Sequence, residues 1–281
     1  MGYCALVECP VRAGPRAIRG GHSVRHELVC GIRRERLSEK VARPARPHPI
    51  LALFVWLLPN SGFKVWALRM LGNRIGENVT LNPNLVINCG YFRIDDGSSI
   101  YSFNAFRNLA RVEIGANSII SRFNQFIASP EYQQFSEFVG VFRMGKYSLV
   151  TNRHYLDCSG QIVLGYHTTI GGLRSILQSH EIDFARDVNT VGRISLGDYS
   201  VSTTGCLFLK GAVLPPYSVL AAGSLLSKPK GAELLEPGLY AGIPAKRIKP
   251  IDHLRWWDRN EILNETTAFD DTDLRLEPLD P

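Results

Sequence analysis

A period of six residues in the second half of the chain constrains the fold more than any other feature. From Leu196, every sixth position is apolar with one exception: Leu196, Ser202, Phe208, Leu214, Leu220 and Leu226. A small residue comes four positions after each of the first five: Ser200, Cys206, Ala212, Ser218 and Ser224. An α-helix repeats its apolar face about every 3.6 residues, and a half-buried strand about every 2. The period of six therefore predicts a β-helix, in which each hexad forms one short strand and a corner.

The same period continues upstream in blocks that differ in phase. The residues predicted to face inward are Ile75, Leu81, Ile87, Ile94, Ile100, Ile114, Ile120, Phe126, Met144, Val150, Leu156, Leu164, Ile170, Ile176 and Ile182. Glycine often follows an inward residue, as in Ile114-Gly115 and Leu164-Gly165, and glycine suits corners where the backbone needs positive φ. The changes of phase predict bulges and extruded loops. An ordinary β-sandwich, the alternative fold, would not keep this period.

Charge and cysteine usage narrow the classes of function. The net charge is +6, and residues 1–48 hold ten Lys or Arg and four Glu, so the rest of the chain is neutral. Because no aromatic platform is interleaved with this charge, we do not expect nucleic-acid binding. Six cysteines are scattered without a Cys-x-x-Cys pair, which favours reduced thiols in a cytoplasmic protein, and Cys206 is expected to pack at a corner.

The chain divides into four parts. Residues 1–48 lack any sustained period and are interpreted as a disordered basic tail, or as the product of a start codon placed upstream, and we expect them to be dispensable. They also lack the apolar core of a signal peptide. Residues 49–72 are predicted to form an apolar helical arm. The stretch 50–58 is too short to span a bilayer. Residues 50–71 therefore either pack against the β-helix or a neighbouring subunit, or associate weakly with a membrane surface beside the basic tail.

The β-helix itself is predicted over residues 73–228. Two breaks in the period, at 129–142 and 177–193, predict loops. Residues 229–281 are expected to add an extended strand at 238–249, a helix at 253–263 and an acidic tail. The fold class is therefore all-β, with a helical arm before the β-helix and a strand and helix after it.

The candidate catalytic residue is His180, at the start of the second break. An aliphatic coil has no structural need for an imidazole, and a neutral His can take a proton from a hydroxyl group. An adjacent carboxylate or carbonyl would fix the tautomer of this His. The alternative is an ordinary polar His in a loop. A second polar cluster, residues 152–157, precedes His180 by about one coil, and neighbouring strands stack about 4.8 Å apart.

A basic cluster near the end of the β-helix suggests an anion site. It consists of Lys228, Lys246, Arg247 and Lys249. Lys binds phosphate as a point charge and Arg as a bidentate fork. The alternative is a solvated basic face.

These features resemble the hexapeptide-repeat acyltransferases, in particular the maltose, galactoside and lipopolysaccharide-sugar O-acetyltransferases. The resemblance covers about residues 60–250 and rests on the hexads of 164–226, the His180 loop, and the stretches 222–228 and 241–249. It implies a homotrimer of left-handed parallel β-helices that binds acetyl-coenzyme A in a groove between subunits. This chain departs from the pattern where Glu181, rather than Pro, follows the loop His, and where the groove wall near Val201 is more open.

The resemblance also implies roles for single residues. His180 corresponds to the general base. Asn152 and Asp157 resemble acceptor contacts of the family. His154, which has no firm counterpart in the sugar acetyltransferases, and Asp183 are also expected to contact the acceptor. The residues that correspond to coenzyme contacts are Ala222, Ser227, Lys228 and Lys249, with Lys246 and Arg247 beside Lys249. Thr204 is also expected to contact the coenzyme. No metal is implied.

The expected function is acetyl transfer from acetyl-coenzyme A to a hydroxyl of a sugar or polysaccharide precursor. We expect this reaction in the cytoplasm, and attachment to the inner face of the membrane stays open as one of the two alternatives for residues 50–71. Three alternatives remain open at the level of sequence. They are N-acetyl transfer to an amino sugar, a metal enzyme like the γ-type carbonic anhydrases, which needs three converging His, and a non-catalytic scaffold.

Overall fold

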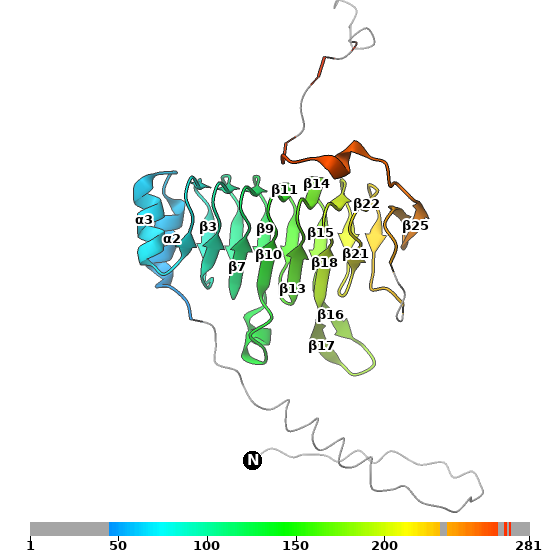
Figure 1. Ribbon diagram of the computed structural model, residues 1–281. Coiled ribbons are helices and arrows are strands. Elements are labelled where there is room, and N and C mark those ends of the chain that lie inside the picture. Colours follow the sequence, from blue (N-terminus) through cyan, green and yellow to red (C-terminus); the bar gives the residue numbers. More distant parts are fainter. Residues whose placement is uncertain (1–44, 231–234, 264–266, 269, 271–281) are drawn as a thin grey trace, which may run out of the picture. The chain divides into compact units, whose positions relative to one another are not determined.

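The computed structural model describes residues 45–230, 235–263, 267–268 and 270. Short strands wind into stacked coils whose sides form three parallel sheets (Figure 1). The first sheet contains β1 (Arg74–Ile75), β4 (Phe92–Ile94), β7 (Arg111–Ile114), β10 (Val141–Met144), β13 (Gln161–Leu164), β18 (Arg193–Leu196) and β21 (Val213–Leu214). The third contains β3 (Leu85–Ile87), β6 (Ala105–Arg107), β9 (Gln125–Ile127), β12 (Tyr155–Asp157), β15 (Ile176–Gln178), β20 (Leu207–Phe208) and β23 (Leu225–Leu226).

The second sheet lies between these two along the chain. It contains β2 (Thr80–Leu81), β5 (Ser99–Ile100), β8 (Ile119–Ile120), β11 (Leu149–Asn152), β14 (Thr169–Leu173), β19 (Val201–Ser202) and β22 (Val219–Leu220), and ends in the hairpin of β24 (Leu239–Gly242) and β25 (Ala245–Lys249). Only the last pair of this sheet is antiparallel. The fold is the predicted all-β, left-handed parallel β-helix.

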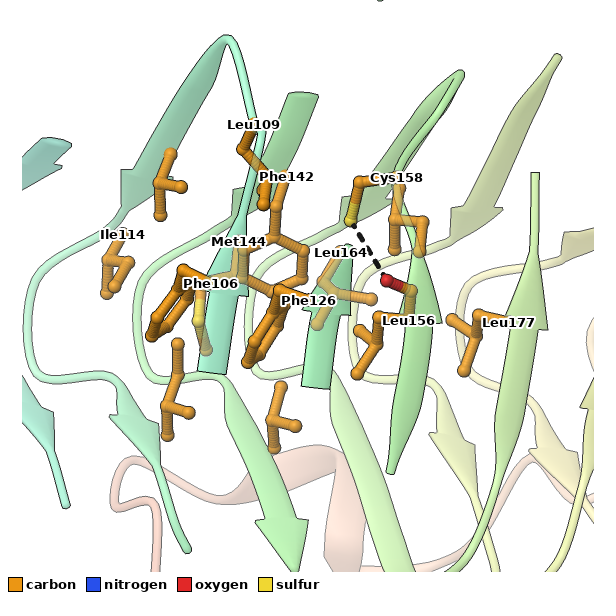
Figure 2. Packing of buried hydrophobic residues seen from close by; sticks show 14 of the residues in the cluster. Phe106, Leu109, Ile114, Phe126, Phe142, Met144, Leu156, Cys158, Leu164 and Leu177 are labelled. Atoms are coloured by element: carbon orange, nitrogen blue, oxygen red, sulfur yellow. Dashed lines mark hydrogen bonds between the residues drawn. The ribbon is translucent and has the colours of Figure 1, made fainter. Parts of the chain in front are cut away.

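The core is a column of apolar side chains inside the coils. Equivalent residues pair from coil to coil, so that Ile114 lies beside Met144 and Met144 beside Leu164. The rings of Phe106 and Phe126 stack with centroids 4.5 Å apart (Figure 2). Because each large apolar side chain that leaves water contributes about 1.5–3 kcal/mol, this column supplies most of the stability of the coil.

Small polar residues complete the corners, as the sequence predicts. Ser200, Cys206, Ala212, Ser218 and Ser224 are all buried. Between the first two sheets, hydroxyl groups form a ladder in which Ser118 Oγ accepts from the Ser148 amide at 3.1 Å and Ser148 Oγ accepts from the Thr168 amide at 3.1 Å. The ladder satisfies backbone groups that the corner removes from the sheets.

The predicted inward register is wrong at three positions. Ile87, Ile176 and Ile182 are exposed. Val86 points inward instead of Ile87, because this corner is one residue shorter than a hexad. Leu177 points inward instead of Ile176, because the pairing of β11 with β14 shifts at a bulge next to Gly172, whose φ is +64°.

Two helices cover the first coils: α2 (Pro49–Leu57) and α3 (Gly62–Met70). Trp56 and Leu68 are buried against the coil. Lys64 is also buried, and its Nζ donates to the carbonyls of Trp56 at 2.8 Å, Leu58 at 2.8 Å and Asn82 at 2.9 Å. Burial lowers the pKa of Lys64 to about 8. No helix among the described residues is long and apolar enough to cross a membrane.

The two breaks in the period are insertions at one corner. The first carries the short 3-10 helix η1 (Pro130–Gln134). The second is not an irregular loop, because β16 (His180–Asp183) and β17 (Val188–Val191) form an antiparallel hairpin. Both insertions project from the same side of the coil in Figure 1.

The C-terminal part differs from expectation. The predicted strand at 238–249 is the β24–β25 hairpin, and the predicted helix at 253–263 is wrong, since only the 3-10 turn η2 (Arg255–Asp258) forms there. Trp257 packs edge-on against Tyr217 at 5.8 Å, and its indole N–H donates to the Ile251 carbonyl at 2.8 Å. These contacts hold the segment against the coil corner. Of the predicted basic tail (1–48), residues 1–44 lie outside the described residues, and so do residues 271–281 of the predicted acidic tail.

Candidate active site

His180 lies where the third sheet turns toward the first. It is the first residue of β16 and follows β15 at the corner from which the hairpin leaves the coil. Ser179, just before it, is buried, and its Oγ accepts from the Gly160 amide at 2.8 Å. The side chain of His180 keeps 36% of its surface exposed. His180 therefore leaves the coil at a buried corner, and its imidazole reaches the surface.

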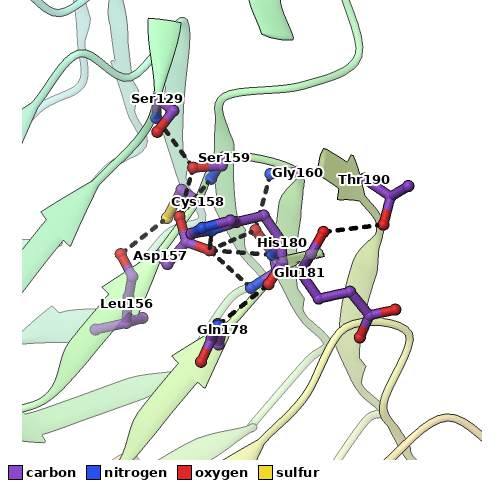
Figure 3. A network of polar contacts seen from close by, with 11 residues as sticks. Ser129, Leu156, Asp157, Cys158, Ser159, Gly160, Gln178, His180, Glu181 and Thr190 are labelled. Carbon is purple, nitrogen blue, oxygen red and sulfur yellow. Dashed lines mark hydrogen bonds and ion pairs between the residues drawn. The ribbon is translucent and has the colours of Figure 1, made fainter. Parts of the chain in front are cut away.

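Asp157 holds the imidazole of His180 in one orientation. Asp157 ends β12, one coil before His180, and its Oδ2 lies 2.6 Å from His180 Nδ1 (Figure 3). A carboxylate can only accept at this distance, so Nδ1 carries a proton and donates it. In the neutral ring Nε2 is then unprotonated and can accept a proton from a substrate.

Asp157 itself is anchored by the coil. It is buried, and its Oδ1 accepts from the Ser159 amide at 3.1 Å and from Ser159 Oγ at 2.5 Å. Its Oδ2 also accepts from the amides of Ser179 at 3.0 Å and His180 at 3.1 Å. These donors offset the cost of burying a carboxylate and fix its position.

Tyr132 of the η1 insertion lies beside the pair of Asp157 and His180, which we call the dyad. Its ring centroid lies 6.3 Å from that of His180. Partial burial and the negative charges of Asp157 and Glu131 raise the pKa of Tyr132. The phenol therefore stays protonated at neutral pH and can donate a hydrogen bond toward a bound group.

Lys210, on the next coil, contacts the hairpin through an ion pair and a hydrogen bond. Its Nζ lies 2.6 Å from Glu181 Oε1 and 2.6 Å from Thr190 Oγ1, so it joins both strands of the hairpin. Its side chain passes close to Gly192, where a Cβ would lie 2.7 Å from Lys210 Cγ. A side chain at Gly192 would displace the lysine from this position.

A cavity of about 310 Å³ lies between the two insertions. Its walls are Phe138 and Val139 from the first insertion, and Val191, Gly192 and Arg193 from the base of the hairpin, with Gly160 and Gln161 between them. Val191 pairs with His180 in the hairpin, which places this cavity next to the dyad.

A larger cavity of about 660 Å³ lies at the C-terminal end of the coil. Its lining includes four of the predicted coenzyme contacts: Ser227, Lys228, Lys246 and Arg247. Lys228 lies one coil beyond Lys210 at the same corner, since Phe208 pairs with Leu226. Three of the four predicted anion-binding residues, Lys228, Lys246 and Arg247, therefore line one basic cavity, and Lys228 lies at the corner that carries His180.

The other predicted coenzyme residues lie elsewhere. Thr204 and Ala222 are exposed at the corner between the second and third sheets, on successive coils. Asn152 lies at this same corner, where its Oδ1 accepts from the Arg122 amide at 3.0 Å. Lys249 is in β25 but not in the lining of the basic cavity. One chain alone does not bring these residues to His180.

Two predicted acceptor contacts have structural roles instead. His154 is 1% exposed, its main-chain N–H donates to Asn124 Oδ1 at 2.9 Å, and its Nδ1 accepts from the Ser175 amide at 3.1 Å. It continues a ladder of Asn84, Asn104 and Asn124 inside the corner, and its Nε2 lies 2.9 Å from Thr151 Oγ1. Asp157 orients His180 rather than facing an acceptor.

Asp183 is the last residue of β16, just before the turn of the hairpin. Its Oδ1 accepts from the Ala185 amide at 3.1 Å, and its Oδ2 pairs with the Arg186 guanidinium at 2.6 Å. Asp183 therefore lies in the same hairpin as His180, and its carboxylate is paired with Arg186 of that hairpin.

Sequence reasoning missed Tyr132 and Lys210. Tyr132 lies in an insertion, where the period gives no information about position. Lys210 occupies the corner position that follows inward Phe208, and the stacking of hexads could have placed it beside the hairpin.

The zinc alternative needs converging His side chains, but His154 and His180 lie at different corners of the coil. Within the described ranges, no group of three or more His, Cys, Asp or Glu side chains could hold a metal ion.

The comparisons with known proteins show a similarity in fold between this chain and several solved structures. No protein-family model matches the chain, and no curated protein matches it in sequence. Among solved structures, a point mutant of AntD, an N-acyltransferase from Bacillus cereus in complex with dTDP and coenzyme A, is 17% identical, with a TM-score of 0.44, over 68% of this chain and 88% of that one.

Two further structures are similar to the same degree. The polysialic acid O-acetyltransferase OatWY is 14% identical, with a TM-score of 0.41, over 72% of this chain and 88% of that one. The hexapeptide-repeat acetyltransferase VCA0836 from Vibrio cholerae O1 biovar eltor, complexed with acetyl coenzyme A, is 14% identical, with a TM-score of 0.42, over 82% and 91%. At such values the likeness concerns fold alone, and the activity must be argued from the site.

Proposed function

We propose that this protein transfers an acetyl group from acetyl-coenzyme A to a hydroxyl of a sugar or polysaccharide precursor, with His180 as general base. The observation that carries the proposal is the 2.6 Å contact between Asp157 Oδ2 and His180 Nδ1. It holds an imidazole with Nε2 free to accept a proton, at a surface insertion beside a cavity. A His in a loop without a role would not need a buried carboxylate partner.

The reaction requires one proton acceptor and two substrates held together. The acceptor oxygen attacks the thioester carbonyl while its proton passes to His180 Nε2. The tetrahedral intermediate then collapses, the carbon–sulfur bond breaks, and the coenzyme thiolate leaves with the proton from Nε2. Asp157 stabilises the imidazolium that forms in between. No covalent intermediate with the protein is needed, because the thioester is already activated and both substrates are positioned.

Positively charged side chains position the acyl donor, acetyl-coenzyme A, in this proposal. Lys228, Lys246 and Arg247 line the basic cavity, which suits the phosphates of coenzyme A. Lys210 lies between this cavity and His180 along the same corner. We place the phosphates in the basic cavity, with the pantetheine arm along the corner and the thioester next to Nε2.

The site is completed by a second copy in this proposal. Asn152, Thr204 and Ala222 share a corner on the other side of the third sheet from His180. In the trimer that the sequence resemblance implies, that corner of one copy faces the His180 corner of the next. The acceptor and the coenzyme would then contact both copies.

The test is release of coenzyme A from acetyl-coenzyme A, detected as free thiol, with a panel of sugars, nucleotide sugars and amino sugars as acceptors. We expect stimulation by one class of hydroxyl acceptor, with acetyl ester found in the product by mass spectrometry. An amide product would identify an N-acetyltransferase instead. Failure to bind coenzyme A in calorimetry would contradict the proposal and favour a scaffold.

A further inference from the structure

The helices α2 and α3 lie at the N-terminal end of the coil (Figure 1). An apolar stripe runs along their exposed faces. It consists of Ile50, Leu51, Phe54 and Leu57 in α2, and Phe63, Trp66 and Met70 in α3, each between 45% and 70% exposed. Their spacing of three and four residues puts each set on one helical face. Phe63 and Trp66 contact each other, with ring centroids 5.7 Å apart.

The fold does not require this stripe. The opposite faces of the helices supply the packing on the coil, through Ala52, Val55, Trp56 and Leu68. Lys64 anchors the pair further by donating to three carbonyls, which removes its charge from the outer face. Polar residues on the outer face would serve the fold equally well, so large apolar residues there indicate a partner.

The charge of the chain changes sign at the end of this region. Residues 40–76 hold six Lys or Arg and no Asp or Glu. Residues 1–76 together hold thirteen Lys or Arg and four Glu, whereas residues 77–281 hold nineteen Lys or Arg and twenty-two Asp or Glu. Cationic sequence is therefore concentrated in the part of the chain that carries the apolar stripe, and the rest is slightly acidic.

We propose that the stripe docks on an anionic phospholipid bilayer, with α2 and α3 lying in the plane of the interface. Apolar area combined with local positive charge is the combination by which helices bind anionic membranes, and Trp and Phe favour the depth of the headgroups. Each helix has nine residues, which suits the interface and not a crossing. This inference is independent of the proposed chemistry.

The test is co-sedimentation of the full chain with lipid vesicles. We expect binding to phosphatidylcholine vesicles that contain phosphatidylglycerol, weaker binding as salt is raised, and little binding to phosphatidylcholine alone. The double variant Phe54→Ser, Trp66→Ser should bind at least about 10-fold more weakly, since two large apolar side chains are lost from the interface. Both side chains are exposed, so the variant should keep its fold.

The matched control is Phe135→Ser with Phe184→Ser, two exposed aromatic residues on the insertions. This control should bind vesicles like the wild type. The proposal is wrong if the wild type does not bind anionic vesicles, or if both double variants bind equally. It is also wrong if Phe54→Ser, Trp66→Ser lowers the number of subunits in lipid-free protein by light scattering, because the stripe is then an interface between copies.

Discussion

At the scale of single residues, the carboxylate of Asp157 connects the hydrogen bonding of the coil with the chemistry of His180. Four of its contacts are to the amides and hydroxyls of Ser159 and Ser179, and the other two are to the His180 amide and to His180 Nδ1 at 2.6 Å. The position of the base is therefore set by a coil neighbour and does not depend on the exposed hairpin alone.

Asp157→Asn keeps the shape of this side chain and removes its charge. We expect acetyl transfer to fall about 100-fold, because the neutral amide stabilises the imidazolium less and does not enforce the tautomer. Affinity for coenzyme A, measured by calorimetry, should not change. Asp187→Asn, at an exposed position of the same hairpin, is the control and should retain activity. Near wild-type activity in Asp157→Asn would rule out this role for the carboxylate.

His154 makes the stability of the coil depend on pH. Burial lowers its pKa to about 4, below the value of about 6.5 that it has in an unfolded chain. The unfolded state therefore binds the proton first as pH falls. The stabilisation is complete above about pH 6.5 and is lost progressively between about pH 6.5 and pH 4. Between about pH 7.5 and pH 5 the loss is about 2 kcal/mol.

His154→Asn should remove this part of the pH dependence, because Asn occupies the equivalent place in the ladder on three earlier coils. Urea denaturation at both pH values measures the effect. Burial and the charge of Arg259 also lower the pKa of His167. The variant should therefore keep a smaller dependence of its unfolding free energy on pH. If the unfolding free energy of the variant changed with pH as much as that of the wild type, His154 would not titrate on unfolding.

At the scale of elements, the bulge at Gly172 determines which residues of the next strand face inward. It adds one residue between inward Ile170 and Leu177 and so sets the phase of β15, the strand that leads to His180. Gly172 has φ +64°, and a Cβ there would lie 2.0 Å from Thr204 Oγ1. Gly205 has nearly the same φ, +66°, with nothing within 4 Å of a Cβ.

This pair separates backbone strain from steric overlap. Gly205→Ala should cost about 1 kcal/mol in unfolding free energy, since only the left-handed backbone conformation is penalised. Gly172→Ala carries the same penalty plus the clash with Thr204, and should cost at least about 2 kcal/mol more. Thermal and urea unfolding of the two variants give the comparison. Equal destabilisation would show that Thr204 can move away without cost.

The same bulge shows where sequence reasoning ends. The period of six predicts the coil and the inward position of Leu164 and Ile170, because steric constraints repeat in every hexad. It also finds His180, since a polar side chain interrupts the pattern there. It cannot distinguish Ile176 from Leu177, because both are aliphatic and a one-residue shift at a glycine leaves no apolar signature. Without that register, Asp157 cannot be paired with His180.

At the scale of the whole molecule, the residues of the candidate site occupy two different corners. Asp157, His180 and Lys210 lie at one, and Asn152 and Thr204 at the other. One straight coil cannot bend these corners together, so a site that uses both needs two copies. The sequence resemblance implied this arrangement, and the period alone could not.

Mixing two inactive variants tests whether the site is shared. If His180→Ala and Asn152→Ala chains are unfolded together and refolded at equal amounts, about a quarter of the interfaces should have both residues intact. Activity should return to about that fraction. Mixing His180→Ala with Asp157→Asn is the control and should restore nothing, because these two residues act in one chain. No recovery in the first mixture would place the site within a single chain or exclude Asn152 from it.

The rate of coenzyme A release by His180→Ala, at saturating acceptor and acetyl-coenzyme A, tests the central claim most directly. With His180 as the general base, the rate should fall about 10²- to 10⁴-fold, while coenzyme A still binds with wild-type affinity. A variant that releases coenzyme A at the wild-type rate would show that the dyad of Asp157 and His180 is not the catalytic base of this protein.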